Sequence, residues 1–376
     1  MGENMRDRLF VVVALFLLLG LSVDVPTVPA ASPDIAKAKK AAETSGFIFE
    51  TSHDAIVSKA RAEGKLRVLS SYAPEAYRAM IELMKRRYPF LDVHVEELTG
   101  PEAQQRFLLE LKAGTVKEWD VVAATPAIYN EFIRESRKFD ILGMAEQGVV
   151  AADPRMIDPE NRRVVAISSN LCSAAYNRNR IAVDRVPNTW EDFLKPEFKG
   201  EKFIVEIRAT CLAGLAAGLG EDWVTDYARK IAAQKPIWAR GATVALTRTI
   251  AGDYALHHMT NYNSCVRAAA KDRTGSLVCK IVQPASVRLM DTEFIIRTAP
   301  HPYAGLLWIE TEVSPEGQKI LDEYGPLKSS IYGPGKLAEA VKGLKVVVND
   351  MKTIQKTTAW TEMVVSAFGF PAANLE

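Results

Sequence analysis

The stretch VPNTWEDFLKPEFKGEKF, from Val186 to Phe203, contains one Trp and three Phe but is interrupted by two prolines and closed by Lys-Gly. Proline removes a backbone donor and fixes φ, so neither a long helix nor a central strand can run through this stretch. A soluble chain rarely places so many aromatic residues in an irregular segment without a partner surface for them. The segment is therefore best explained by the elements on either side of it.

Those elements alternate between strand and helix patterns. Leu66–Ser70 is a short apolar run typical of a buried strand, and Pro74–Phe90 has apolar residues at helical spacing until Pro89 ends it. A strand, a helix with Pro101 in its first turn, and a further buried strand follow at 91–98, 101–114 and 119–125. Strands that alternate with helices of this length predict an α/β fold with parallel sheets covered on both faces.

The second half of the chain has the same alternation of strand and helix patterns, and 376 residues are enough for two hydrophobic cores. We expect the chain to pass from one lobe to the other near residues 165–170 and to return near 285–292. The expected first lobe is 54–168 plus 285–330, and the second is 169–284 plus 331–376. His257 and His258 fall inside a predicted strand that runs into a polar loop, Asn261–Asn263, and the segment after Lys345 is expected to return as a helix.

The N-terminus has the pattern of a secretory signal peptide. Arg6 and Arg8 precede an apolar run, Leu9–Val23, and a small-residue site lies at Val28–Ser32. We expect residues 1–31 to be removed by cleavage near Ala30 or Ala31, which predicts a periplasmic protein. The alternative is an uncleaved anchor, although the run is short for a bilayer-spanning helix.

Charge and cysteine content narrow the class further. The formal net charge is +1 without a long run of either sign, which argues against nucleic-acid binding. The four cysteines form no C-x-x-C, and an oxidising compartment favours disulfides. Cys265 with Cys279 is the favoured pair, and the pairing that also involves Cys172 and Cys211 stays open, as do free thiols.

Several motifs together resemble one family. The opening stretch fits the pattern P-x-T-W-E-D-[FL]-L-x-P-x-[FW]-K-G at Pro187–Gly200, which resembles the hallmark of bacterial extracellular solute-binding proteins of ABC importers. The resemblance is closest to the family-1 branch with the ferric-iron-binding proteins. Six other stretches match in the expected order, between about Glu63 and Gly325: EGKLRVLSSY, MKRRYPFLDVHVEE, WDVVAAT, AAYNRNRI, IAGDYAL and APHPYAGLLWIETEVSPEGQKIL.

The resemblance implies a two-lobed periplasmic-binding-protein fold of type II, each lobe a parallel-rich sheet flanked by helices, with a ligand cleft between the lobes. It implies that Trp190, Phe193 and Phe198 anchor the opening stretch in a core. Thr189 would cap a short helix there, with Asp192 three residues further on.

Ligands of such sheets bind beyond the carboxyl ends of strands, so the polar residues that follow each predicted strand are the candidates. The candidate ligand-binding residues are Ser70, Ser71, Tyr72, Thr99, Thr125, Asn170, Arg208, Thr210, Asn261, Tyr262 and Asn263. Gly100, Ser169 and Ala209 are neighbours in the same stretches. Arg208 precedes a predicted helix N-terminus, which favours an anion site, and the alternative is a structural pair with Glu206.

Ferric-binding relatives place two adjacent Tyr in a loop like Asn261–Asn263, but only Tyr262 matches here. Ser71 stands where such relatives often supply another iron ligand. We therefore expect a small anion or a chelated metal as ligand, with Tyr262 as the metal ligand if iron is bound, and ferric ion as a transported ligand and not a cofactor.

Two functions from other classes remain as alternatives, a secreted enzyme and a ligand sensor. The sequence lacks G-x-S-x-G, H-E-x-x-H, a P-loop and G-x-G-x-x-G after a strand, so no catalytic residue is predicted. The main expectation is a monomeric binding protein that closes by hinge motion on its solute and docks on an ABC permease in the inner membrane.

Overall fold

The computed structural model of the chain describes residues 32–98, 100–124, 128–200 and 202–370. The predicted signal peptide at 1–31 lies outside these residues. The strands are β1 (Lys65–Ser70), β2 (Asp92–Glu97), β3 (Val121–Ala124), β4 (Val165–Asn177), β5 (Phe203–Glu206), β6 (Ile237–Ala239), β7 (Leu256–Asn261), β8 (Leu277–Lys280), β9 (Ala285–Ile295) and β10 (Val346–Asn349).

The helices fall between these strands, as the alternating pattern predicts. They are α1 (Pro33–Thr44), α2 (His53–Glu63), α3 (Pro74–Arg87), α4 (Pro101–Lys112), α5 (Tyr129–Phe132), α6 (Ile141–Glu146), α7 (Thr210–Gly214), α8 (Ala216–Leu219), α9 (Glu221–Ala233), α10 (Ala242–Ala251), α11 (Tyr262–Lys271), α12 (Pro302–Val313), α13 (Pro315–Tyr324), α14 (Lys336–Ala340) and α15 (Thr357–Ala367).

The strands form one continuous path with the order β2-β1-β3-β9-β4-β7-β5-β6, while β10 pairs with β9 and β8 with β4. β1 is parallel to β2 and β3, and β5 is parallel to β6 and β7. The parallel prediction is therefore confirmed within each half. Antiparallel pairing occurs where β4 and β9 join the two halves.

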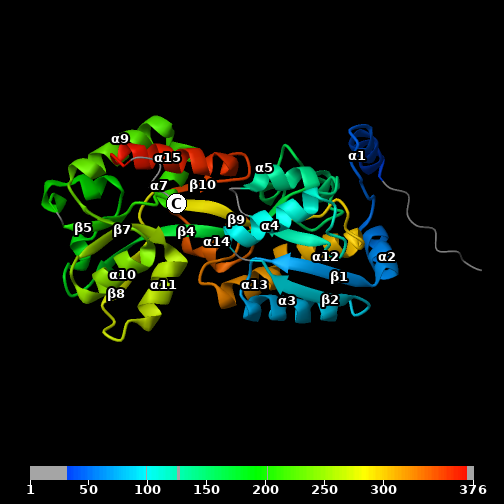
Figure 1. Cartoon of the computed structure of the whole chain (residues 1–376), viewed down its shortest axis with the longest axis horizontal. Helices are drawn as coiled ribbons and strands as arrows, with labels where there is room; N and C mark the ends of the chain where they lie inside the picture. Colours follow the sequence, from blue (N-terminus) through cyan, green and yellow to red (C-terminus); the bar gives the residue numbers. More distant parts are fainter. Residues whose placement is uncertain (1–31, 99, 125–127, 201, 371–376) are drawn as a thin grey trace, which may run out of the picture.

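β4 and β9 are the longest strands and run side by side through the middle of the molecule (Figure 1). Each passes from one group of elements to the other. The β1–β3 group lies on one side in Figure 1, and the β5–β7 group with α9 and α15 lies on the other. The molecule therefore has the two-lobed α/β architecture that the resemblance implies.

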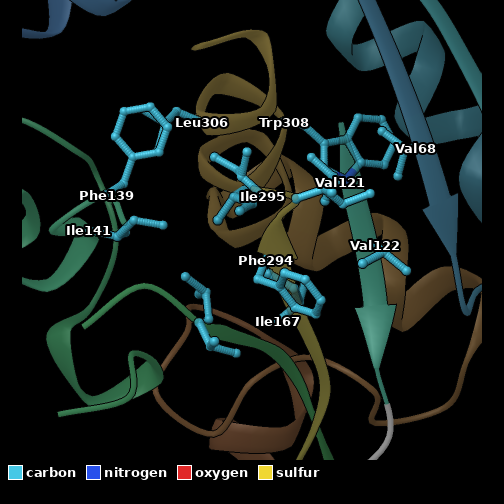
Figure 2. Packing of buried hydrophobic residues seen from close by; sticks show 14 of the residues in the cluster. Val68, Val121, Val122, Phe139, Ile141, Ile167, Phe294, Ile295, Leu306 and Trp308 are labelled. Carbon is cyan, nitrogen blue, oxygen red and sulfur yellow. The ribbon is translucent and has the colours of Figure 1, made fainter. Parts of the chain in front are cut away.

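The first lobe has a core of side chains from β1, β3, β9 and α12, several of which Figure 2 shows in contact. Val68, Val121, Phe294 and Trp308 are each at most 1% exposed. α12 is buried on nearly all of its surface because its sequence, PYAGLLWIETEV, is apolar around most of the helix. Gly305 matters here, since a Cβ at this position would lie 3.0 Å from Val121 Cγ2.

The second lobe has its own core, and the opening stretch is part of it. Trp190 and Phe193 are fully buried and Phe198 is 5% exposed. The Trp190 indole N–H donates to the Pro284 carbonyl over 2.9 Å, which ties the stretch to the segment before β9. Thr189 Oγ1 accepts from the Asp192 N–H, and the Asp192 carboxylate accepts from the Thr189 N–H. The core position of this stretch is confirmed. The two bonds between Thr189 and Asp192 are present, but the helical turn begins at Glu191, so Trp190 and not Thr189 occupies its cap position.

Two disulfides lie in the second lobe. Cys172 on β4 is bonded to Cys211 on α7, and Cys265 on α11 is bonded to Cys279 on β8. The favoured pairing of Cys265 with Cys279 is thus present, and the open question about the other two cysteines is answered by a second bridge.

One local prediction is wrong. Asn261–Asn263 is not a polar loop, because α11 begins at Tyr262 directly after β7. The apolar side of α11 packs beside Leu246 and Leu277, which the Asn-rich start of the helix conceals in the sequence.

The helix predicted after Lys345 is confirmed as α15, which packs in the second-lobe core. The same segment first adds β10 to the sheet, a strand that the sequence did not indicate.

Candidate functional site

A pocket of ≈ 370 Å³ opens at the carboxyl ends of β5, β6 and β7, which we name the second-lobe pocket. The loops after these strands lead into α7, α10 and α11, so three helices begin around it. Polar side chains and the backbone of one glycine turn line this pocket. The residues are Glu206, Arg208, Thr210, Gly241, Thr243, Thr260 and Asn261. This is the edge at which open α/β sheets bind ligands.

Arg208 and Glu206 form an ion pair in this pocket, with Nε and Oε1 separated by 3.4 Å. Burial raises the pKa of Glu206, while Arg208 and the Ala242 N–H oppose that rise. The Arg208 side chain is 56% exposed. The structural pair, named as the alternative for this arginine, is therefore present. More than half of the Arg208 side-chain surface nevertheless remains open to solvent or to a ligand.

Thr210 and Asn261 line the same pocket, one at the start of α7 and the other at the end of β7. The Asn261 Oδ1 accepts from Asn170 Nδ2 over 2.7 Å. Asn170 belongs to β4, one of the two crossover strands. The structure thus brings together four of the residues predicted from separate strand ends, namely Asn170, Arg208, Thr210 and Asn261.

A second, smaller pocket of ≈ 160 Å³ lies where the crossover strands meet α11 and the segment after α13, which we name the interlobe pocket. Asn170 and Asn263 line it together with Ser168, Met290, Asp291 and Lys328. Lys328 Nζ lies 3.1 Å from Asp291 Oδ2. Asn263 Oδ1 is buried and has no hydrogen-bond partner among the described residues, so an acceptor is available for a solute or a water.

Three other predicted residues follow β1 and line neither pocket. Ser70 is fully buried and its Oγ accepts from the Tyr72 N–H. Ser71 donates to Asp291 Oδ1 over 2.8 Å. Tyr72 is 1% exposed, and burial raises the pKa of its phenol well above the usual range. In this conformation these side chains support the first lobe. Thr99 and Thr125 lie outside the described residues.

Tyr262 directly follows Asn261 but lines neither the second-lobe pocket nor the interlobe pocket. Its ring packs against the apolar cluster that includes Leu171 and Val287. Leu171 follows Asn170 on the same strand, so the two side chains point to opposite faces of the sheet. Within the described parts of the chain, no group of three or more His, Cys, Asp and Glu residues has a metal-binding arrangement.

His257 and His258 are both buried in β7, as expected for packed histidines. His258 contacts Tyr227, whose hydroxyl lies 2.8 Å from Nε2, and its ring lies 4.7 Å from that of Phe193. Burial lowers the pKa of each imidazole to about 3, so both are neutral at physiological pH. They therefore add no positive charge to the second-lobe pocket, which His258 lines.

The sequence analysis missed several residues of these pockets. Thr243 follows β6, which has only three residues and was not recognised as a strand. Asp291 and Lys328 were not predicted either, although a charged residue within the apolar run of β9 is a signal that could have marked Asp291. Lys328 lies in a loop whose approach to β9 has no local sequence signal.

Another hollow, of ≈ 630 Å³, is larger than both pockets. It is lined by Lys65 and Asp92, the first residues of β1 and β2, together with Trp119 and His301. It therefore lies at the amino ends of parallel strands, opposite to the edge at which ligands bind in such sheets. Its size alone does not make it the site.

The two lobes, the paired crossover strands and a polar pocket at the carboxyl strand ends define a periplasmic-type binding protein of type II. A family model for bacterial extracellular solute-binding protein matches residues 143–356. The chain belongs to this family, and it is a solute-binding protein. No curated protein sequence matches it.

Solved structures with the same fold include three iron-binding proteins. Ferric iron-binding protein A from Mannheimia haemolytica, in an open conformation, has a TM-score of 0.63 and 15% identity and covers 82% of this chain and 100% of its own. The Trichodesmium protein in complex with iron and citrate has a TM-score of 0.60 and 17% identity, with coverage of 81% and 98%. The ferric binding protein from Campylobacter jejuni has a TM-score of 0.56 and 19% identity, and the match covers 81% of this chain and 100% of that protein.

At such identities the likeness to these structures establishes the fold of the chain. In the parts that the structure describes, no helix has the length and apolar character needed to cross a membrane.

Proposed function

We propose that the protein captures a small anionic solute between its lobes and delivers it to an ABC permease. The single observation that supports this best is the polar pocket at the carboxyl ends of β5, β6 and β7, joined to the crossover strand by the bond between Asn170 and Asn261. Hydroxyl, amide and guanidinium groups in one pocket suit an oxygen-rich anion. The proposal includes no chemical step on the solute.

The lobes of this proposal are residues 54–168 plus 285–330 and residues 169–284 plus 331–376. Val347, Trp360 and Val364 pack in the second-lobe core, which supports the assignment of the C-terminal segment to that lobe. Met351 and Ile354 pack in the first-lobe core, so this segment contributes to both lobes. Ala42 and Phe49 pack in the first-lobe core, so the segment before residue 54 adds to that lobe. Residues 1–31 would direct export to the periplasm, where a monomer would act.

Iron enters the proposal as cargo and in chelated form. The Trichodesmium structure contains iron with citrate, and the other two solved proteins are named for ferric iron. In this chain Tyr262 is the one tyrosine of the predicted pair, and it packs against an apolar cluster. We therefore favour a ferric chelate whose organic anion contacts the pocket, or the organic anion alone, over bare ferric ion.

Native mass spectrometry of the protein purified from the periplasm without refolding tests the proposal. A tightly bound solute stabilises the folded state and survives gentle purification. A discrete added mass is the expected result, and it would separate an organic anion from a ferric chelate. A ligand-free mass, together with no thermal shift on adding citrate, ferric citrate or phosphate, would overturn the proposal.

A second readout separates the two forms of iron. A ferric ion held by Tyr262 produces a tyrosinate charge-transfer colour, and a ferric citrate complex held through its citrate does not. We expect ferric citrate to bind without that colour. A visible band that disappears in Tyr262→Phe would overturn the chelate form of the proposal.

A further inference from the structure

Arg288 on β9 is a half-buried cation that has no ion-pair partner among the described residues. Its Nε is buried and makes no hydrogen bond to any described residue, and no carboxylate of the described chain lies within ion-pair distance of it. Burial lowers the pKa of Arg288 to about 10, which still leaves the guanidinium charged at physiological pH. Removing an unpaired charge from water, even in part, costs free energy. We therefore expect an arginine in this position to bind an anion.

The register of β9 places Arg288 beside residues that line the interlobe pocket, although Arg288 is not itself one of the lining residues. Its register partner on β4 is Asn170, and Met290 lies two residues further on the same face of β9. Asn170 and Met290 both line the interlobe pocket. Arg288 itself falls between the apolar cluster of Val287 and that of Leu289, at the passage from one lobe to the other.

On its other side Arg288 packs against α7, and the first residues of this helix line the second-lobe pocket. Ser286, on the same face of β9, donates to the Cys211 carbonyl of α7 over 2.9 Å. Gly214 makes room for the Arg288 stem, because a Cβ at Gly214 would lie 3.2 Å from Cγ and 3.3 Å from Cδ. Arg288 therefore adjoins elements of both pockets.

Arg208 differs from Arg288 in each of these respects. It is paired with Glu206, and its side chain is 56% exposed. A paired and well-hydrated charge such as Arg208 contributes less to binding than an unpaired guanidinium that is partly removed from water, as that of Arg288 is. Arg288 is therefore the stronger of the two candidates for binding the anion.

We propose that Arg288 binds the oxyanion group of the transported solute, a carboxylate or a phosphate, at the floor of the cleft between the lobes. The inference rests on the proposed function and specifies which residue recognises the charge. Because Arg288 lies on a crossover strand, an anion held there contacts the hinge region that both lobes share, and Asn170 offers an amide beside it.

Titration calorimetry on the full mature protein, unfolded in urea and refolded by dialysis to remove bound solute, tests this with citrate and with inorganic phosphate as probes. At least one of them should bind the wild type, and which one binds identifies the oxyanion. Arg288→Met should weaken that binding about 10- to 100-fold, as expected for loss of a charged hydrogen-bonded contact. Arg288→Lys should restore it in part, since lysine keeps the charge but not the bidentate geometry.

Arg137 provides a matched control. It is also half-buried with an unpartnered buried Nε, but it stacks over the Phe139 ring at 5.7 Å and lies in the first lobe. Arg137→Met should leave citrate and phosphate affinity unchanged. Gly214→Ala tests the position independently: it keeps the charge but crowds the Arg288 stem, and it should weaken the same anion.

Equal anion affinity in Arg288→Met and wild type overturns the inference, and so does a wild type that binds neither probe. Native mass spectrometry distinguishes this failure from failure of the proposed function. A solute mass retained by both wild type and Arg288→Met from the periplasm keeps the binding function and removes Arg288 from it. A wild type that is ligand-free and also shows no thermal shift with citrate, ferric citrate or phosphate removes the function itself.

Discussion

Asn170 and Asn261 join the crossover strand to the second lobe through one side-chain hydrogen bond, from Nδ2 to Oδ1 over 2.7 Å. Asn170 lines the interlobe pocket and Asn261 lines the second-lobe pocket. The bond therefore fixes the position of two candidate ligand groups relative to each other before any solute arrives. Such preorganisation reduces the entropy that binding must overcome.

Replacing Asn170 by Ala should lower both stability and affinity. The free energy of unfolding in urea should fall by about 1 kcal/mol for the lost hydrogen bond. Citrate binding, measured by calorimetry, should weaken because Asn261 loses its orientation. Asn188→Ala, at an exposed site of the opening stretch, is the control and should change neither. Unaltered citrate affinity in Asn170→Ala would contradict a role for this pair in the site.

The sequence predicted the strand ends better than it predicted which side chains reach the pockets. Asn170, Arg208, Thr210 and Asn261 converge because parallel strands end at one edge, and strand ends are visible in apolar patterns. Ser70 is also at a strand end but is fully buried, because the chain after β1 turns toward Asp291. That turn is set by tertiary contacts, which strand periodicity does not encode.

The same limit explains why Arg288 was missed. It lies in the middle of a strand, and only residues at the ends of predicted strands were considered as candidates. Its importance comes from the absence of a carboxylate within ion-pair distance in the described parts of the chain. A missing partner is a property of three-dimensional packing. The helix start at Tyr262 was missed for a different reason, since polar Asn residues on both sides of it suggest a loop.

The two disulfides should differ in their contribution to stability. Cys172–Cys211 closes a 39-residue separation and Cys265–Cys279 a 14-residue one. Loop-entropy arguments give about 4 kcal/mol for the first and about 3 kcal/mol for the second. Urea unfolding of the double Ser variants should follow this order.

The change in citrate affinity should distinguish the two disulfide variants more clearly than the change in stability does. Cys211 lines the second-lobe pocket beside Thr210, while Cys265 is buried against Ala175 and Leu246. Citrate binding should therefore weaken in Cys172→Ser/Cys211→Ser and stay unchanged in Cys265→Ser/Cys279→Ser. Equal loss of citrate affinity in both variants would show that the first bridge has no particular role at the pocket.

Glu293 and Glu312 form a buried carboxyl pair in the first lobe, and both are fully buried. Trp308 Nε1 donates to Glu293 Oε2 over 3.2 Å, and Glu312 has no hydrogen-bond donor among the described residues. Burial raises the pKa of Glu293 to about 7, and burial together with the Glu293 charge raises the pKa of Glu312 as well. The folded state therefore favours the protonated carboxyls.

This raised pKa predicts that stability falls as the pH rises. The unfolded carboxyl ionises near its ordinary value of 4.5, while folded Glu293 keeps its proton until about pH 7. Between these two pH values the free energy of unfolding should therefore fall, by up to about 3 kcal/mol. Urea unfolding of wild type should show this loss between pH 5 and pH 7.5, and Glu312→Gln should reduce it. Glu323→Gln, at an exposed position of α13, should retain the full loss.

Asp291 and Lys328 should show the opposite dependence on pH. Although burial opposes it, Lys328 and the hydroxyls of Ser168 and Ser71 hold the pKa of Asp291 below its ordinary value. A lowered carboxyl pKa gives stability that is present at neutral pH and is lost as the pH falls toward the folded pKa. Lys328 Nζ lies 3.1 Å from Asp291 Oδ2, and the two side chains are only 28% and 11% exposed.

Lys328→Met should therefore cost about 3–5 kcal/mol of unfolding free energy at pH 7, because it leaves the Asp291 charge buried without its cation. Asp291→Asn in the same chain should recover part of that loss, since the neutral amide removes the unpaired charge, and its oxygen can accept from one of the two serine hydroxyls while its NH2 group donates to the other. Lys328→Met should also begin to lose stability at a higher pH than wild type on acidification. Urea unfolding of the two single variants and the double variant at pH 7 and pH 4.5 measures both effects. Additive losses, within about 0.5 kcal/mol, would mean that the two residues do not interact across the floor of the cleft.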